Sequence, residues 1–196
     1  MMPVYEWDVR WLLWVQRSTH SAAFQWTLKQ AAQYGDWIWL ALLGVILVLD
    51  RRRGKLVCLI GITAWGFSSY IGDTLLKPLL KHPRPFSVPS LAPQIRLLIP
   101  APSSLSFPSS AAAVSFAVAG VIAYFYSGRK ALAVLLLASL IAYSEIYAGV
   151  HFPSDAIGGA VMGSVVAIME PAVAVRWWRQ AQAAPPKPAR AGGPPK

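Results

Sequence analysis

The chain has 196 residues, of which 56% are hydrophobic and only 13% are charged, a balance that argues against a water-soluble domain and points to the membrane. The net charge of +10 comes without zinc-ligand spacing or a basic helix with base-reading residues, so we expect no nucleic-acid partner. Cys58 is the single cysteine and lies in an apolar run, which excludes an intrachain disulfide and disfavours a catalytic thiol.

The first segment, residues 1–30, mixes aromatic and charged residues instead of forming an apolar run. Trp11 and Trp14 accompany Asp8 and Arg10. An amphipathic helix with this pattern lies in the membrane interface. We therefore predict an interfacial segment here; a sixth span would require these charges to face the interior of a helix bundle.

Five apolar runs follow, and each is long enough to cross about 30 Å of hydrocarbon. They are residues 31–49, 56–80, 105–126, 131–150 and 156–175. The predicted fold is all-α: an integral membrane helical bundle of five spanning helices, or six if the first segment also spans. We expect the bundle to occupy residues 31–178. Residues 179–196 are rich in Pro, Gly and Ala and are predicted to form a disordered cytoplasmic tail.

The Lys and Arg residues of the connections predict the orientation of the chain, because cytoplasmic loops carry an excess of them. Eleven follow the first, third and fifth runs, whereas the opposite connections hold three, with Lys77 at the end of its run. We therefore predict a multi-pass protein of the cell membrane with a cytoplasmic C-terminus. The connections after the second and fourth runs are then extracytoplasmic.

Two of the candidate phosphate-binding clusters lie at the two ends of the connection between the second and third runs. Lys77 and Arg84 form the first, and a Lys and an Arg together suit a clamp on phosphate. By itself Lys77 is more simply explained as a lysine that snorkels to the interface. Ser109 and Ser110 form the second, near the start of the third run, where free backbone N–H groups and hydroxyls favour an anion. By themselves these serines fit an ordinary helix cap.

A third cluster follows the fourth run, where His151 precedes Asp155 by four residues. An aspartate at this spacing orients a histidine, whose other nitrogen is then available to attack phosphorus or to move a proton. Independent snorkelling and capping would not place all three clusters at the outer ends of spans. Their coincidence predicts one phosphate site on the extracytoplasmic face.

At this point the sequence resembles the type 2 phosphatidic acid phosphatase family of membrane enzymes, which includes bacterial isoprenyl-diphosphate phosphatases. The family's first motif, Lys, six residues and Arg-Pro, is matched by Lys77 and Arg84-Pro85. Its third motif, Ser-Arg, five residues, His, three residues and Asp, is matched at Ser144, His151 and Asp155. The resemblance covers roughly residues 70–160.

The resemblance implies a role for each matched residue. His151 would be the nucleophile that forms a phosphohistidine, and Asp155 its orienting partner. The phosphate cradle would consist of Lys77, Arg84 and Ser109, with Ser110 beside them. No metal and no cofactor would be needed.

Two positions depart from the family pattern, and both fall in the catalytic motifs. The second motif ends in His, but this chain reads Pro108-Ser109-Ser110-Ala111, so the residue that would protonate the leaving oxygen is replaced. Glu145 stands where the third motif has Arg. Loss of a general acid costs about 10²- to 10⁴-fold in rate. The chain is then an engineered inactive form, a natural pseudoenzyme, or an enzyme that uses a rearranged acid such as Glu145 or His82.

Three functions follow from these residues. The leading one is an integral membrane phosphatase that removes a phosphate from a lipid phosphate or isoprenyl diphosphate, impaired or inactivated at Ala111 and Glu145. Its partners would be the lipid-phosphate substrate and membrane lipid. The alternative is a non-catalytic protein that binds or translocates lipid phosphate, and the third is a structural membrane scaffold. The apolar spans do not distinguish acyl from isoprenyl tails.

Overall fold

The computed structural model describes residues 4–18 and 21–183, and that part of the chain consists of helices and loops without strands. An all-α membrane bundle, as predicted, is confirmed. The α-helices are α1 (Glu6–Ser18), α2 (Ala22–Leu49), α3 (Gly54–Ser69), α4 (Lys77–Leu80), α5 (Ser110–Phe125), α6 (Arg129–Tyr147) and α7 (Pro153–Ala183). A π-helical stretch, Tyr70–Leu76, joins α3 to α4. Two short 3₁₀ turns, Pro85–Ser87 and Ala92–Gln94, interrupt the long connection to α5.

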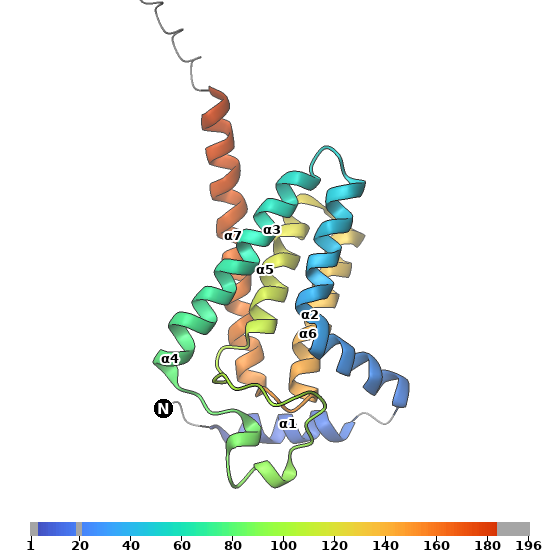
Figure 1. Cartoon of the computed structure of the whole chain (residues 1–196), viewed down its shortest axis with the longest axis vertical. Coiled ribbons are helices and arrows are strands. Elements are labelled where there is room, and N and C mark those ends of the chain that lie inside the picture. The colour runs from blue at the N-terminus through green and yellow to red at the C-terminus, as the bar shows by residue number, and fades with distance from the viewer. Residues whose placement is uncertain (1–3, 19–20, 184–196) are drawn as a thin grey trace, which may run out of the picture.

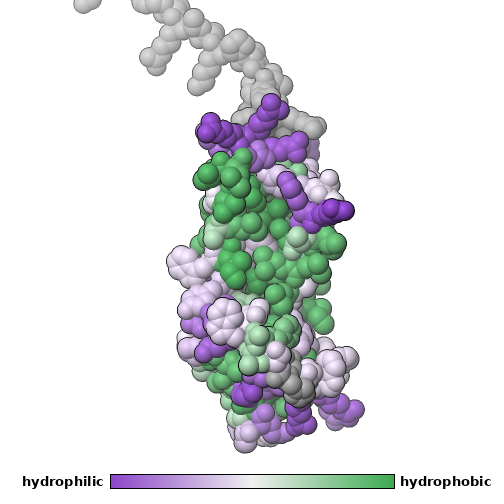
Figure 2. Space-filling view, turned by 90° about the vertical axis from the view of Figure 1, so that its right-hand side faces the viewer, coloured by the Kyte–Doolittle hydropathy of each residue, from purple (hydrophilic) through white to green (hydrophobic). Residues whose placement is uncertain are grey.

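Helix α5 lies at the centre of the bundle and contacts α2, α3, α6 and α7 (Figure 1). Its sequence is apolar around its whole circumference, as expected of a helix enclosed on all sides. Most of its residues are buried, from Ala112 to Ile122. The helices that surround it expose large apolar side chains, among them Val48, Leu136 and Ile168. Figure 2 shows such a hydrophobic band beneath a hydrophilic group at one end of the molecule.

The contact between α5 and α7 is close because α7 presents glycine where the backbones meet. A Cβ atom on Gly159 would collide with the carbonyl oxygen of Ser109, and one on Gly163 with that of Ala113. Small residues let spanning helices approach in this way. The approach also joins the start of α5 to the start of α7, since the Ser109 N–H donates to the Asp155 carbonyl at 3.0 Å.

The spans agree with the prediction except at the third run. Four stretches of the described residues are long and apolar enough to cross a membrane: Ala22–Leu49, Gly54–Ser87, Arg129–Tyr147 and Pro153–Ala174. Helix α5 is shorter than the predicted run of residues 105–126, because residues 105–109 are not helical and the helix begins only at Ser110. It has 16 residues and is enclosed by its neighbours.

The predicted segment of residues 1–30 divides between two helices. Helix α1 lies across the end of the bundle (Figure 1), with Leu12 and Val15 buried and Trp11 and Trp14 exposed, which is the expected amphipathic pattern. Residues 22–30 belong to α2, which bends at Tyr34, where φ is −122° and ψ is 15°. The helix is therefore continuous at residue 30, where we predicted a boundary. The bend at Tyr34 separates the first turns of α2 from its apolar part. Residues 1–3 and 19–20 of the predicted segment lie outside the described residues.

The predicted tail is partly helical. Helix α7 continues to Ala183, so residues 179–183, which we expected to be disordered, continue the helix. Their sequence, Arg-Gln-Ala-Gln-Ala, consists of strong helix formers, whereas the prolines on which the prediction rests begin at residue 185. Residues 184–196 of the predicted tail lie outside the described residues.

Candidate active site

The bundle end near α1 brings together the cations and the His-Asp pair predicted from the sequence. Lys77 begins α4, Arg84 follows it in the connection, and Asp155 lies in the first turn of α7. His151 lies in the turn between α6 and α7. All four side chains are buried, each with at most 5% of its surface exposed. Arg84 Nη1 is 3.2 Å from His151 Nε2.

The contacts of His151 determine which of its nitrogens carries the proton. An arginine N–H can only donate, so Nε2, at 3.2 Å from Arg84 Nη1, is the acceptor nitrogen. In a neutral imidazole the proton then resides on Nδ1. That nitrogen faces Ser106 Oγ at 3.3 Å and Asp155 Oδ2 at 3.5 Å. Nε2 therefore has its lone pair directed at the cationic side of the site.

Burial keeps the imidazole of His151 neutral. It lowers the pKa of His151 to about 4, and the charges of Arg84 and Lys77 act in the same direction, while Asp155 opposes them. A histidine must be unprotonated to act as a nucleophile. At neutral pH His151 is therefore already in the form that can attack.

The carboxylate of Asp155, which faces His151 Nδ1, also accepts hydrogen bonds from three other groups. His82 Nδ1 lies 3.0 Å from Oδ1, while Ser106 Oγ donates to Oδ2 at 2.6 Å and the Phe152 N–H does so at 2.7 Å. His82 entered the sequence analysis only as a possible acid, and Ser106 was missed. The only feature of the sequence that could have pointed to Ser106 is its position two residues before the Pro108-Ser109 motif.

Ser104 accepts hydrogen bonds from both Arg84 and Lys77. Its Oγ lies 3.0 Å from Arg84 Nη2 and 3.4 Å from Lys77 Nζ, and its carbonyl oxygen accepts from Arg84 Nε at 2.7 Å. Ser104 is exposed, and it borders an open pocket of about 390 Å³ that Arg84 also lines. A phosphate entering from this pocket would replace the Ser104 oxygens on the two cations. Ser104 had no signature in the sequence.

Lys77 forms an ion pair with Asp73, which lies four residues earlier in the chain. Nζ lies 2.7 Å from Asp73 Oδ1 and 2.9 Å from Ser110 Oγ. The Ser110 hydroxyl in turn lies 2.6 Å from Asp73 Oδ1. Ser110, one of the predicted phosphate ligands, thus contacts the cation that would bind phosphate.

Ser109 has a capping role in this structure. Its Oγ accepts a hydrogen bond from the Ala112 N–H at 3.2 Å, which is the standard N-cap interaction of a serine. This is the simpler of the two interpretations weighed from the sequence. A contact between Ser109 and phosphate stays a prediction.

The two departures from the family pattern lie on different helices. Ala111 lies in the first turn of α5, where it is partly buried against the hydrophobic core. Glu145 lies in the last turn of α6 and is buried, with Oε2 at 3.9 Å from His151 Nε2. The carboxyl group therefore lies on the side of His151 that a phosphorus atom would approach.

Helix α1 closes the end of the bundle beside the candidate site. Asp8 is buried and accepts from the Ser154 N–H at 2.9 Å and from Ser154 Oγ at 2.6 Å. Burial raises the pKa of Asp8, and the bonds from Ser154 oppose that shift. Ser154 precedes Asp155, so α1 is tied to the first turn of α7. The described residues contain no group of three His, Cys, Asp or Glu side chains placed to hold a metal ion.

Known proteins are similar to this chain in sequence. Residues 55–182 match the PAP2 superfamily. The decaprenylphosphoryl-5-phosphoribose phosphatase of Mycobacterium tuberculosis (strain H37Rv) is 36% identical over 147 residues, which cover 71% of this chain and 75% of that protein. The undecaprenyl-diphosphatase of Sulfolobus acidocaldarius is 28% identical over 144 residues, which cover 70% of this chain and 65% of that protein.

A solved structure shares the fold. The crystal structure of Aquifex aeolicus LpxE superimposes with a TM-score of 0.60 at 22% identity, covering 85% of this chain and 94% of that one. The match over residues 55–182, more than half of the chain, shows that this chain belongs to the PAP2 superfamily of membrane lipid phosphatases.

Proposed function

We propose that this chain removes a phosphate from a lipid phosphate or isoprenyl diphosphate at the extracytoplasmic face of the membrane. The observation that carries the proposal is the position of His151. Its Nε2 is unprotonated and faces Arg84, while its Nδ1 faces Ser106 and Asp155. A buried nucleophile oriented on one side and flanked by cations on the other is the arrangement that attack on a phosphate requires.

The first chemical step would be attack on phosphorus. The phosphate oxygens displace Ser104 from Arg84 and Lys77, and the lone pair of His151 Nε2 forms a bond to phosphorus. The bond from phosphorus to the lipid oxygen breaks, and that oxygen leaves with its electron pair and takes up a proton from solvent water. The positive charge that develops on the imidazole is stabilised by Asp155 through Nδ1.

The second step would be hydrolysis of the phosphohistidine. A water oxygen bonds to phosphorus, the bond between phosphorus and Nε2 breaks, and His151 recovers its lone pair as inorganic phosphate leaves. Because Ala111 replaces the family's acid, the first step lacks its usual proton donor, and we propose that turnover is slow for this reason. Glu145 adds to the effect, because a carboxylate at 3.9 Å from Nε2 repels phosphate when it is ionised.

The substrate class is proposed from the relatives. The two named above act on a decaprenylphosphoryl phosphoribose and on undecaprenyl diphosphate. Both are polyprenyl compounds, so an isoprenyl-linked phosphate is the first candidate. The excess of Lys and Arg at the opposite end of the bundle supports an extracytoplasmic site with a cytoplasmic C-terminus.

Phosphate release from lipid in proteoliposomes tests the function. Phosphatidate, phosphatidylglycerol phosphate and an isoprenyl diphosphate are compared as substrates. Arg84→Gln is expected to reduce release at least 100-fold, because it removes a charged contact to phosphate inside a buried site. Lys81→Gln is the matched control, since Lys81 is exposed in the same connection. Release at background level from all three lipids, by this chain and by Ala111→His with Glu145→Arg, would refute the proposal.

A second prediction concerns His82, which we propose as a positioning residue that acts through Asp155. His82→Phe removes the donor to Oδ1, and a hydrogen bond to a charged group contributes about 1.5–3 kcal/mol. The expected result is a kcat about 10- to 100-fold lower with KM unchanged. His82→Asn keeps a donor and should restore most of the rate. Equal loss in both variants, or a change confined to KM, would contradict this role.

A further inference from the structure

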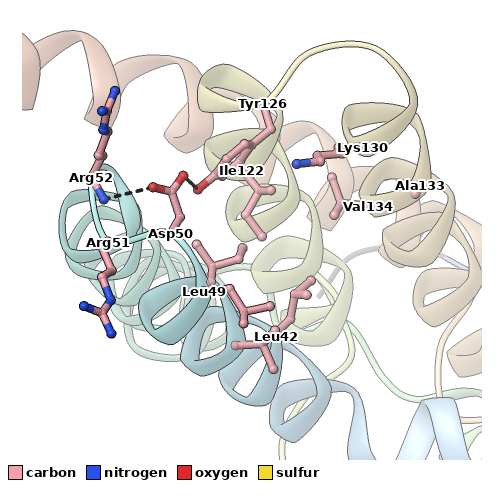
Figure 3. A pocket seen from close by; sticks show the side chains of 12 residues that line it. Leu42, Leu49, Asp50, Arg51, Arg52, Ile122, Tyr126, Lys130, Ala133 and Val134 are labelled. Carbon is pink, nitrogen blue, oxygen red and sulfur yellow. Dashed lines mark hydrogen bonds between the residues drawn. The ribbon is translucent and has the colours of Figure 1, made fainter.

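A crevice of about 640 Å³ opens between α2 and α6 at the end of the bundle opposite His151 (Figure 3). Its volume falls within the range of about 300–1,000 Å³ typical of small-molecule sites. Side chains of two spanning helices and the end of α5 form its apolar walls, namely Leu42, Ile46, Leu49, Ile122, Ala133 and Val134. Leu49 is 78% exposed, so the crevice is open toward the surface that a lipid bilayer would cover.

The polar end of the crevice carries more positive than negative charge. Arg51, Arg52 and Lys130 line it, with Asp50 as the one acidic residue among the lining residues. The Asp50 carboxylate is already bound, since it accepts from the Tyr126 hydroxyl at 2.8 Å and from the Arg52 N–H at 3.0 Å. The carboxylate keeps its charge, so three cations and one anion leave the polar end with an excess of two positive charges.

The three cationic side chains are available to an anion. Within residues 4–18 and 21–183, neither guanidinium nor the Lys130 ammonium forms an ion pair or a hydrogen bond with another side chain. Lys130 Nζ lies 5.4 Å from the centre of the Tyr126 ring, so it is held beside the crevice (Figure 3). All three residues are exposed, and they can approach a ligand at the membrane interface without breaking an ion pair or a side-chain hydrogen bond within the described residues.

We propose that this crevice binds one anionic phospholipid. An acyl chain would lie along the apolar walls between α2 and α6, and the phosphate of the headgroup would contact Lys130 and the two arginines. Apolar walls that end in unpaired cations match the two parts of such a lipid, whereas a zwitterionic lipid would leave the excess positive charge unbalanced. The site shares no residue with the candidate active site, so the proposal goes beyond the phosphatase function and does not depend on it.

Photocrosslinking of a labelled lipid tests the site directly. The full chain is placed in phosphatidylcholine nanodiscs that contain a small fraction of phosphatidylglycerol with a diazirine in one acyl chain. After irradiation, labelled residues are identified by mass spectrometry. Labelling of the crevice is expressed relative to labelling of Leu59 and Phe67, which are exposed on α3 away from the crevice. A phosphatidylcholine probe with the same diazirine is measured in parallel.

The expected result is preferential labelling of the crevice by the phosphatidylglycerol probe. Arg51→Gln with Lys130→Gln should reduce it about 25-fold, at about fivefold for each cation removed near a membrane surface. The matched control is Lys55→Gln with Arg129→Gln, which removes two exposed cations from the same end that do not line the crevice. This control should leave the labelling ratio unchanged.

Two tryptophan substitutions on α6 test whether the acyl chain lies in the apolar part of the crevice. Ala133→Trp should block the crevice and abolish the preference, whereas Leu136→Trp, one turn further along α6, should not. Equal crevice labelling by the two probes would overturn the proposal. An equal loss in both charge variants would also overturn it, because it would indicate general attraction of anionic lipid to a basic surface.

Discussion

Replacing Ala111 by His together with Glu145 by Arg is expected to raise phosphate release by about 10²- to 10⁴-fold, the usual contribution of a general acid. His at position 111 would lie in the first turn of α5, one residue from Ser110, which already contacts Lys77. Arg at position 145 would replace a carboxyl group that lies 3.9 Å from His151 Nε2. Release of inorganic phosphate from an isoprenyl diphosphate in proteoliposomes measures the gain.

The matched control replaces Ala111 by Asn and Glu145 by Arg. Asn fills a comparable volume and does not release a proton, so this variant should bind substrate as well as the Ala111→His, Glu145→Arg variant does. It should turn over little faster than the original chain. A gain of the same size with Asn would show that the acid is not what the chain lacks. If neither variant gains activity while both bind lipid phosphate, the non-catalytic alternative would be favoured.

The second large effect is expected at His151. His151→Gln should reduce phosphate release to background in this chain and in the Ala111→His, Glu145→Arg variant, because no other described side chain holds a nucleophilic nitrogen between Arg84 and Asp155. Rapid alkaline quenching of the enzyme with ³²P-labelled substrate should trap an alkali-stable, acid-labile phosphohistidine. Its position is then found by peptide mapping.

The contrasting variant is Asp155→Asn, which leaves the nucleophile but removes the charge that stabilises the imidazolium. It should lower the rate strongly while a small amount of phosphohistidine is still trapped. A ³²P-phosphoryl group found on His82, or full activity of the His151→Gln variant, would contradict the assignment of His151 as the nucleophile.

The membrane class and most of the bundle could be predicted from the sequence, because the length of an apolar run is set by the thickness of the bilayer and needs no partner. The runs that became α2, α3 and α6 follow this rule. The prediction was weakest for α5, because loop residues 105–109, Leu-Ser-Phe-Pro-Ser, carry no charge and so lengthened the uncharged run beyond the helix. It also missed the helical residues 179–183, because the prolines further along dominated the composition of that segment.

Sequence spacing by itself determined the candidate nucleophile and the cations, since His151, Asp155, Lys77 and Arg84 lie within short motifs. Only the tertiary structure decided what surrounds them. His82 and Ser106 contact Asp155 from positions 73 and 49 residues earlier in the chain, and the α5–α7 approach that holds the two helix starts together depends on Gly159 and Gly163. Such contacts follow from packing between distant segments, and no local pattern encodes them. The same holds for the crevice between α2 and α6, because a groove exists only once two helices lie side by side.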